Sequence, residues 1–351
     1  MPRSAHNPSL PQCIGCNVLV PSEQATTMRI AITDGLHADA IAKLQAESGG
    51  EVSELEPEAL GSGAGSPITA LIVRSRTKVT ASVMASLPEL RVVGRAGVGV
   101  DNIDLEAATA AGIRVVNAPR ASTHSVVELT MAHLLASVRY LGPSDRAMRD
   151  GRWIKKQAKG TELAGKRLGL VGYGRIARGV AAVASALGME VHAYDPYLPD
   201  GVDIAPATTL HGTLDDLFRS CTHISLHCGL TPETHHMVDA RRLGLMPHVG
   251  ADGVACGAHV VNCARGGLID ETAASAALGD GTLSSLALDV FEQEPVADDH
   301  PLLAHDRFHG TPHIGASTHE AQRRVGMDIA DAVLETLATG SCATVVNRDV
   351  L

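Results

Sequence analysis

Aromatic residues are scarce in this sequence. They make up 2 % of the 351 residues, whereas apolar residues as a whole reach 45 %. The interior must therefore be built from Ala, Val, Leu and Ile, and the length is sufficient for two domains with a substantial core in each.

Basic residues are also in deficit. The chain has 29 Lys and Arg against 39 Asp and Glu, which gives a formal net charge of −10. This balance disfavours nucleic acid and anionic membranes as partners, because both attract cationic proteins. An anionic substrate would need a local basic pocket.

Long apolar runs and metal-ligand patterns are missing as well. No run approaches the ~18 apolar residues of a membrane-spanning helix, the N-terminus lacks the apolar core of a signal peptide, and seven scattered cysteines suit a reducing compartment. We expect a soluble, cytoplasmic protein without a membrane partner.

Cys13 and Cys16 have metal-ligand spacing but no second pair nearby, and helix-breaking residues separate His309 from His313. We therefore expect no metal.

Strand-like and helix-like runs alternate along most of the chain, which is typical of parallel sheets covered by helices. We predict an α/β protein of two doubly wound domains, a Rossmann domain over residues 119–317 inserted in a flavodoxin-like domain of residues 28–118 and 318–351. Periodicity alone does not establish that the C-terminus, with its strand-like residues 343–347, returns to the first domain. Residues 1–27 contain four prolines, and we expect a disordered tail there.

Two segments need separate comment. Residues 122–141 have apolar positions at helical spacing, and we expect Ser125 and Glu128 to form a capping box near the start of this helix. Residues 246–258 contain turn residues and no periodicity, which indicates a surface loop to which we assign no chemistry.

A nucleotide-binding pattern follows the strand-like residues LGLV. The pattern is GxGxxA, in which glycines allow a tight turn and close approach of a pyrophosphate, and Ala177 allows close helix packing. Asp195 ends the next strand-like run, at the distance expected of the group that binds the adenosine ribose. Its charge would repel a 2′-phosphate, so we predict NAD rather than NADP. The predicted loop residues are Gly172, Gly174, Arg175 and Ile176.

Three further strings, each after a strand-like run, contain an arginine, a carboxylate and a histidine. Arg265 can grip a substrate carboxylate in bidentate fashion, His313 can exchange a proton with a keto or hydroxyl oxygen, and Glu294 can hold and charge the histidine. Together they suggest interconversion of 2-keto and 2-hydroxy acids.

From about residue 29 to residue 347 the chain resembles the D-isomer-specific 2-hydroxyacid dehydrogenases, and within them the phosphoglycerate dehydrogenase branch. The strings in common are LIVRSRTKVT, VVGRAGVGVDNIDLEAAT, GTELAGKRLGLVGYGRIAR, VVNCARGGLIDE, ALDVFEQEP and PHIGASTHEAQ. The resemblance implies that Arg265 binds substrate, that His313 is the acid and base, and that Glu294 pairs with it.

The same resemblance implies further contacts. Asp289 is expected near the nicotinamide amide, and the cofactor is expected to be lined by Val98, Cys228, Cys263, Ala264, Gly315 and Ala316. For the substrate we expect the N–H groups of Gly97, Val98 and Gly99 together with the Arg74 side chain. Arg152, Lys155 and Lys156 are candidate phosphate contacts, although a solvated basic loop is the alternative.

The resemblance implies NAD-dependent oxidation of 3-phospho-D-glycerate to 3-phosphohydroxypyruvate, the first step of serine synthesis. Reduction of hydroxypyruvate or glyoxylate is the alternative within the family, and a non-catalytic, corepressor-like NAD sensor is the alternative of another class. The expected assembly is a homodimer or a dimer of dimers, with the helix of residues 122–141 either at the dimer contact or in the core. Because the chain ends soon after its last strand-like run, we expect no serine feedback through a C-terminal regulatory module.

Overall fold

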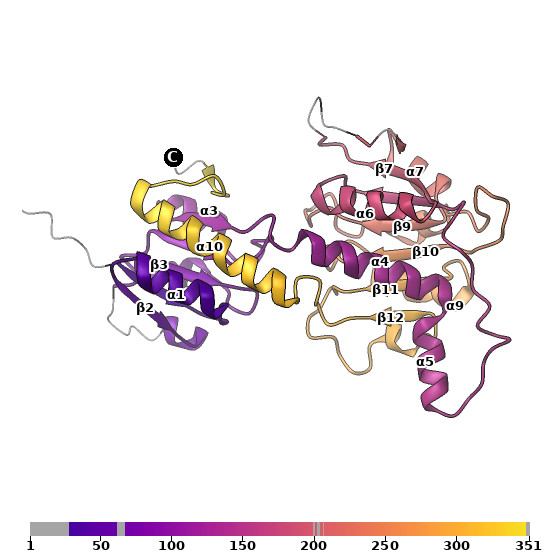
Figure 1. Cartoon of the computed structure of the whole chain (residues 1–351), viewed down its shortest axis with the longest axis horizontal. Helices are drawn as coiled ribbons and strands as arrows, with labels where there is room; N and C mark the ends of the chain where they lie inside the picture. The colour runs from indigo at the N-terminus through magenta and orange to yellow at the C-terminus, as the bar shows by residue number, and fades with distance from the viewer. Residues whose placement is uncertain (1–27, 62–66, 199–200, 202–203, 206, 349–351) are drawn as a thin grey trace, which may run out of the picture.

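The computed structural model describes residues 28–61, 67–198, 201, 204–205 and 207–348. The tail expected to be disordered, with Cys13 and Cys16, lies outside these residues. Figure 1 shows two lobes, joined where α4 and α10 begin.

The first lobe contains a five-stranded parallel sheet in the order β2-β1-β3-β4-β5. This is the flavodoxin-like order 2-1-3-4-5. The strands are β1 (Arg29–Ile32), β2 (Glu51–Glu54), β3 (Ala70–Val73), β4 (Val92–Arg95) and β5 (Arg114–Asn117). The helices are α1 (Ala38–Glu47), α2 (Ala81–Ala85), α3 (Leu105–Ala110) and α10 (His319–Thr339), with a short 3-10 helix at Pro57–Gly61.

Both faces of this sheet are covered, which explains the fully apolar sequence ALIV of its central strand β3. Ile30 and Ile72 face one core cluster, shared with α1 and α10, and Ala31 and Leu71 face another, shared with α2 and α3. All four residues of β3 are buried.

The second lobe contains a seven-stranded parallel sheet in the order β12-β11-β10-β9-β6-β7-β8. Renumbered from β6, this is the Rossmann order 3-2-1-4-5-6 with one more strand at the edge. The strands are β6 (Arg167–Val171), β7 (Glu190–Tyr194), β8 (Thr208–Leu210), β9 (His223–Leu226), β10 (His259–Asn262), β11 (Ser285–Leu288) and β12 (Phe308–Gly310).

Helices cover both faces of the second sheet. One face carries α4 (Thr123–Arg139) and α6 (Arg175–Ala186), in front of the strands in Figure 1. The other carries α7 (Leu214–Ser220), α8 (Ala240–Leu243) and α9 (Glu271–Asp280). Two more elements lie at the periphery, α5 (Leu141–Arg149) and a 3-10 helix at Pro301–Ala304. The prediction of two doubly wound parallel-sheet units is therefore confirmed.

The C-terminal segment packs on the first lobe. Helix α10 lies against α1, β4 and β5, and Figure 1 shows it leading back from the second lobe. The expected strand at residues 343–347 is reduced to one antiparallel bridge, Val345 with Val116. The Asn347 side chain completes the edge of β5 by accepting from the Val115 N–H at 2.8 Å and donating to the Ile113 carbonyl at 2.8 Å.

The predicted capping box of α4 is wrong. Ser122 precedes the helix without a side-chain cap, and Ser125 lies inside the first turn with its Oγ 2.8 Å from Thr318 Oγ1. Thr318 in turn caps α10 by accepting from the Ala321 N–H. This pair of hydroxyls therefore ties together the two places where the chain crosses between lobes. Among the described residues, no helix has the length and apolar composition needed to cross a membrane.

Candidate active site

The glycine-rich loop lies between β6 and α6, at the switch point of the second sheet. Gly172 has a φ of 85° and a side chain there would meet the His227 backbone at 3.0 Å, so only glycine fits this turn. Gly174 begins α6 without a side-chain cap, and a Cβ at this position would have nothing within 4 Å. The loop thus offers open space and uncapped helix N–H groups, which suit a pyrophosphate.

Asp195 follows β7 directly and faces this loop. One carboxylate oxygen accepts from the Tyr173 N–H at 2.9 Å and the other from the Tyr197 N–H at 2.9 Å. Two N–H donors hold the carboxylate beside the turn, and lone pairs remain for ribose hydroxyls. Arg175 reaches the other way, donating to the Pro119 carbonyl at 2.8 Å in the first crossing between the lobes.

The arginine, carboxylate and histidine come from three neighbouring strands. Arg265 follows β10, Glu294 follows β11, and His313 follows β12, all at the carboxyl edge of the sheet. Ligands of doubly wound proteins bind at this edge, because successive loops converge there. The order β12-β11-β10 therefore brings together residues that lie 48 positions apart in the sequence (265 to 313).

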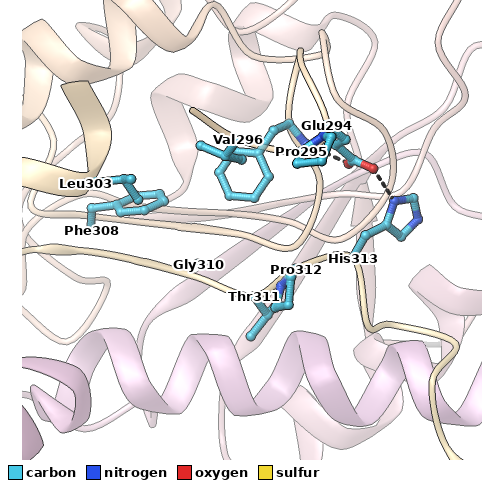
Figure 2. Close-up of a pocket in the computed structure, with 10 residues that line it drawn as sticks. Glu294, Pro295, Val296, Leu303, Phe308, Gly310, Thr311, Pro312 and His313 are labelled. Atoms are coloured by element: carbon cyan, nitrogen blue, oxygen red, sulfur yellow. Dashed lines mark hydrogen bonds and ion pairs between the residues drawn. The ribbon is translucent and has the colours of Figure 1, made fainter. Parts of the chain in front are cut away.

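His313 and Glu294 form a hydrogen-bonded pair, drawn in Figure 2. His313 Nδ1 lies 2.8 Å from Glu294 Oε2, and Glu294 Oε1 accepts from the Phe291 N–H at 3.0 Å. The hydrogen bond to Glu294 raises the pKa of His313, although burial opposes this. Burial would raise the pKa of Glu294, but the bonds from His313 and the Phe291 N–H outweigh it and leave that pKa below its usual range.

A pocket of about 520 Å³ opens beside this pair (Figure 2). Its other lining residues are mainly apolar, among them Phe291, Leu303 and Phe308, and none is cationic. The pocket thus places apolar side chains on one side of the histidine–glutamate pair. A group that binds the substrate carboxylate must lie outside this pocket.

The turn that carries His313 is stabilised by hydrogen bonds to the buried side chain of Asp289. His313 has a φ of 53°, which few non-glycine residues adopt. Asp289 is 1 % exposed, and its carboxylate accepts from the Ile314 N–H at 2.8 Å, the Gly315 N–H at 2.8 Å and the Thr311 hydroxyl at 2.6 Å. In this structure Asp289 therefore positions the turn that carries the candidate acid and base, a role that nothing in the sequence indicated.

Arg265 reaches from the second lobe to the first. Its Nε lies 3.0 Å from Asp101 Oδ2, its Nη1 donates to the Ala264 carbonyl at 2.6 Å, and a side chain at Gly99 would collide with its guanidinium. Its positive charge also contributes to lowering the pKa of Glu294. The guanidinium therefore lies between the histidine pair and the loop of residues 95–99.

Comparison with known proteins points to one enzyme family. The model of the D-isomer-specific 2-hydroxyacid dehydrogenase NAD-binding domain matches residues 131–315. D-3-phosphoglycerate dehydrogenase of Methanocaldococcus jannaschii is 44 % identical over 327 residues, which cover 91 % of this chain and 59 % of that protein. Hydroxypyruvate reductase of Thermotoga maritima is 42 % identical over 272 residues, 77 % of this chain and 85 % of that protein. The TT0316 protein of Thermus thermophilus superposes with a TM-score of 0.80 at 34 % identity, over 91 % of this chain and 100 % of that one.

The chain belongs to the D-isomer-specific 2-hydroxyacid dehydrogenase family. The residues that match the NAD-binding domain of this family, 131–315, include the glycine-rich loop and all three of Arg265, Glu294 and His313.

The other residues expected at the cofactor of this dehydrogenase-family member lie in the same lobe, except Val98, which follows β4 in the first lobe. Cys263 is buried and Cys228 is half-buried. Burial raises the pKa of the Cys263 thiol to about 12 and that of the Cys228 thiol to about 11. Both thiols therefore stay neutral. The Ala264 N–H donates to the Asn262 side chain at 2.9 Å, and the Ala316 carbonyl accepts from the Gln322 side chain at 2.9 Å, so both loops are held in place.

The loop of residues 95–99 corrects one expectation. The Gly97 N–H already donates to the Arg95 carbonyl at 2.8 Å, so it is not available to a carboxylate in this conformation. No described residue accepts a hydrogen bond from the N–H groups of Val98 and Gly99, and these two remain as candidate donors. The Val98 carbonyl accepts from the Asn117 side chain at 2.7 Å, which anchors the loop.

The Arg74 segment is fixed by Asp34, a residue absent from the sequence-based expectations. The Asp34 carboxylate accepts from the N–H groups of Arg74 and Thr77, each at 3.0 Å. Burial would raise the pKa of Asp34, but these hydrogen bonds outweigh it. Asn102 donates to the Arg74 carbonyl at 2.8 Å. No signal in the sequence linked Asp34 to a loop forty residues later.

Arg95 is a second residue that the sequence-based expectations did not include. It ends β4, its Nε is buried without a hydrogen-bond partner among the described residues, and burial followed by the nearby charge of Arg265 lowers its pKa to about 10. Arg74 adds to the same effect. Three guanidinium groups therefore gather at this edge of the first lobe, with Asp101 and Asp34 as the neighbouring carboxylates. The string RAGVG contains Arg95, but the expectation for this string concerned only its backbone N–H groups.

Proposed function

We propose that this protein oxidises 3-phospho-D-glycerate to 3-phosphohydroxypyruvate with NAD, the first step of serine synthesis. The observation that carries the proposal is the meeting of Arg265 with the His313–Glu294 pair at the carboxyl edge of the second sheet. The similarity to the phosphoglycerate dehydrogenase of M. jannaschii supports the substrate.

In this proposal the two lobes divide the work. Residues 119–317 bind NAD, and residues 28–118 with 318–351 bind the substrate, with Arg74 and Arg95 holding its phosphate. NAD, when bound, supplies the acceptor for the hydride that leaves C2. Closure of the lobes would exclude water from the cleft.

Arg265 and His313 then have separate tasks. Arg265 exchanges its contact with Asp101 for the substrate carboxylate, which takes the same kind of charge-assisted hydrogen bond. His313 keeps Nδ1 bonded to Glu294 and accepts the C2 hydroxyl proton at Nε2. The reverse reaction returns that proton to the keto oxygen. The expected nicotinamide contact of Asp289 stays a proposal, as do the expected cofactor contacts of Val98, Cys228, Cys263, Ala264, Gly315 and Ala316.

A substrate comparison tests the proposal. We expect kcat/KM to be higher for 3-phosphohydroxypyruvate than for hydroxypyruvate, and Arg95→Gln to reduce this ratio by about tenfold or more, because a charge-assisted contact to phosphate contributes about 1.5–3 kcal/mol. Arg91→Gln, an exposed arginine just before β4, is the matched control. Equal kcat/KM values for the two substrates in the unmodified protein would reject phosphoglycerate as the substrate.

The second candidate is reduction of hydroxypyruvate or glyoxylate. The hydroxypyruvate reductase of T. maritima favours it, because this chain covers 85 % of that protein. A non-catalytic NAD sensor of the corepressor kind would not need the paired His313 and Glu294. If no 2-keto acid were reduced but NADH promoted binding to a protein partner, the sensor would be favoured instead.

We propose a homodimer, but not through the apolar face of α4. That face is buried in the core with α6, through Val127, Met131 and Leu134. Packing within one chain therefore explains the helical spacing of the apolar residues of α4. The proposal rests on large apolar side chains of α5 that stay exposed, Leu141 at its start and Met148 near its end. Arg152, Lys155 and Lys156 are exposed in the following segment, where a partner subunit would be needed to bring them to a substrate.

A further inference from the structure

A second pocket, of about 530 Å³, lies at the amino-terminal edge of the second sheet. Its walls include His259 at the start of β10, Ser284 just before β11 and Arg307 just before β12, together with Tyr140 at the end of α4. His313 follows the opposite end of β12. The pocket is therefore separate from the candidate active site.

The charged side chains that line this pocket, Lys159 and Arg307, are both basic. His248 lies in the same lining, and no carboxylate does. His259 also lines it, but its ring nitrogens are occupied by the Ser285 hydroxyl at 2.6 Å and the Cys256 carbonyl at 2.8 Å, and burial lowers its pKa to about 4. In a chain of net charge −10, a cavity with only cationic charge is unexpected.

Arg307 is the fixed cation of the pocket. Its Nε donates to the Ser284 carbonyl at 2.7 Å, its Nη2 to the Ser137 carbonyl at 3.4 Å, and its guanidinium lies 3.7 Å from the centre of the Tyr140 ring. Burial lowers the pKa of Arg307, and among the described residues no carboxylate pairs with it. A half-buried guanidinium that lacks a counter-ion and is pre-oriented by two carbonyls is suited to bind an oxyanion.

The loop of residues 246–258 forms one wall of this pocket. His248 and Cys256 contribute to the lining, and the loop is folded back on itself by the Val249–Ala255 bridge. Asp252 in the same loop pairs with Lys166 at 2.6 Å, and the Lys166 side chain is 3 % exposed. The segment to which the sequence suggested no chemistry is thus a structured wall.

We propose that this pocket binds the phosphate group of a small anion, at a second ligand site distinct from the active site. Arg307 and Lys159 hold the phosphate. Val138, Leu278 and Leu283 provide an apolar wall for the carbon part of an organic phosphate, and the volume lies within the range of about 300–1,000 Å³ of small-molecule sites. Orthophosphate and a phosphate monoester share the chemistry that the basic side chains recognise.

Calorimetric titration with orthophosphate and with glycerol 2-phosphate tests this site. The titrations use a protein with Arg74→Gln, Arg95→Gln and Arg265→Ala, so that phosphate binding by the three arginines of the catalytic cleft is suppressed. We expect Lys159→Gln in that protein to weaken phosphate binding by about tenfold or more, since a charge-assisted hydrogen bond is lost. Lys43→Gln, which makes the same charge change in the first lobe, should leave the affinity unchanged.

Arg307→Lys serves as the second variant, since it keeps the charge but loses the planar fork. It should weaken binding while a thermal melt shows that the protein stays folded. Tighter binding of glycerol 2-phosphate than of orthophosphate would identify an organic ester as the ligand, and equal binding the free ion. The proposal is overturned if Arg74→Gln, Arg95→Gln and Arg265→Ala together abolish all phosphate binding, or if Lys159→Gln and Arg307→Lys leave it unchanged. Because the readout is binding, this result is independent of the proposed dehydrogenase reaction.

Discussion

At the scale of single residues, position distinguishes the candidate acid–base pair from similar pairs. His236 lies 3.0 Å from Glu292 and His300 lies 2.9 Å from Glu271, so a histidine beside a glutamate occurs three times in the described chain. Of these three pairs, only His313 with Glu294 lies close enough to Arg265 for its charge to act on both partners, at the carboxyl edge of the sheet. A histidine–carboxylate pair alone is therefore weak evidence of catalysis.

Removal of the His313 imidazole should abolish proton transfer. We expect His313→Ala to lower kcat by about 10²–10⁴-fold, the usual contribution of a general base, with NADH affinity kept because the glycine-rich loop is intact. Steady-state kinetics and NADH fluorescence measure the two effects. His236→Ala is the matched control, since His236 has a similar φ of 51° and its own glutamate partner. Unchanged turnover in His313→Ala would reject the mechanism.

The pKa of His313 sets the pH dependence in each direction. Oxidation needs neutral His313 and rises as pH increases through its raised pKa, whereas reduction needs the imidazolium and falls through the same pKa. Glu294→Gln removes the hydrogen-bonded charge that raises this pKa, so both limbs of the kcat/KM profiles should move to lower pH. Glu292→Gln, in the pair with His236, should leave them in place. Limbs that do not move in Glu294→Gln would assign them to another group.

At the scale of elements, the strands and the GxGxxA loop could be predicted because their signals are local. The run LGLV, the two glycines and Asp195 lie within about 30 residues, and hydrophobic pattern and turn chemistry fix their arrangement. The expected partnership of Glu294 with His313 also appears in the structure. The chemistry of the two residue types suggests this partnership, and the family resemblance then implies it as well.

Contacts between distant segments could not be predicted in this way. Asp101 meets Arg265 across 164 positions, and Ser125 meets Thr318 across 193. The packing of two lobes decides both contacts, and no local pattern encodes it. The capping box failed for the same reason, because Ser125 satisfies its hydroxyl with a residue from the other crossing rather than with its own helix.

The packing of α10 on β4 depends on Gly94. A Cβ at this position would lie 2.7 Å from Val333 Cγ2 and 3.2 Å from Ile329 Cγ1, both on α10. Gly94→Ala should therefore lower the free energy of unfolding by about 1–3 kcal/mol through overpacking, measured as a lower urea midpoint. Gly212→Ala is the control, since a Cβ there would meet nothing within 4 Å. An unchanged midpoint in Gly94→Ala would show that α10 shifts at little cost.

At the scale of the whole molecule, the lobes are joined by few described contacts. The two crossings are tied by Ser125 with Thr318 and by Arg324 with the Ala121 carbonyl at 2.9 Å, and Arg265 with Asp101 adds a contact across the cleft. Such an arrangement permits rotation of one lobe against the other about the crossings. A substrate carboxylate that displaces Asp101 from Arg265 would couple binding to this rotation.

The exposed apolar side chains around α5 bear on the assembly of the molecule. Leu141 and Met148 are each 57 % exposed, and α5 projects from the second lobe in Figure 1. Large apolar groups gathered on one projecting element are typical of an interface. We expect light scattering after size exclusion to give about twice the chain mass of 36.5 kDa.

Charge placed in that surface should separate the subunits. Leu141→Lys with Met148→Lys should shift the measured mass to that of one chain, because a buried unpaired ammonium group costs several kcal/mol at an interface. Val183→Lys places the same charge at an exposed apolar position on α6 and should leave the dimer intact. If the double variant keeps the mass of a dimer, the interface lies on another face of the molecule. If the unmodified protein has the mass of one chain at all concentrations, the homodimer is rejected. The exposed apolar side chains of α5 would then have to contact a different partner.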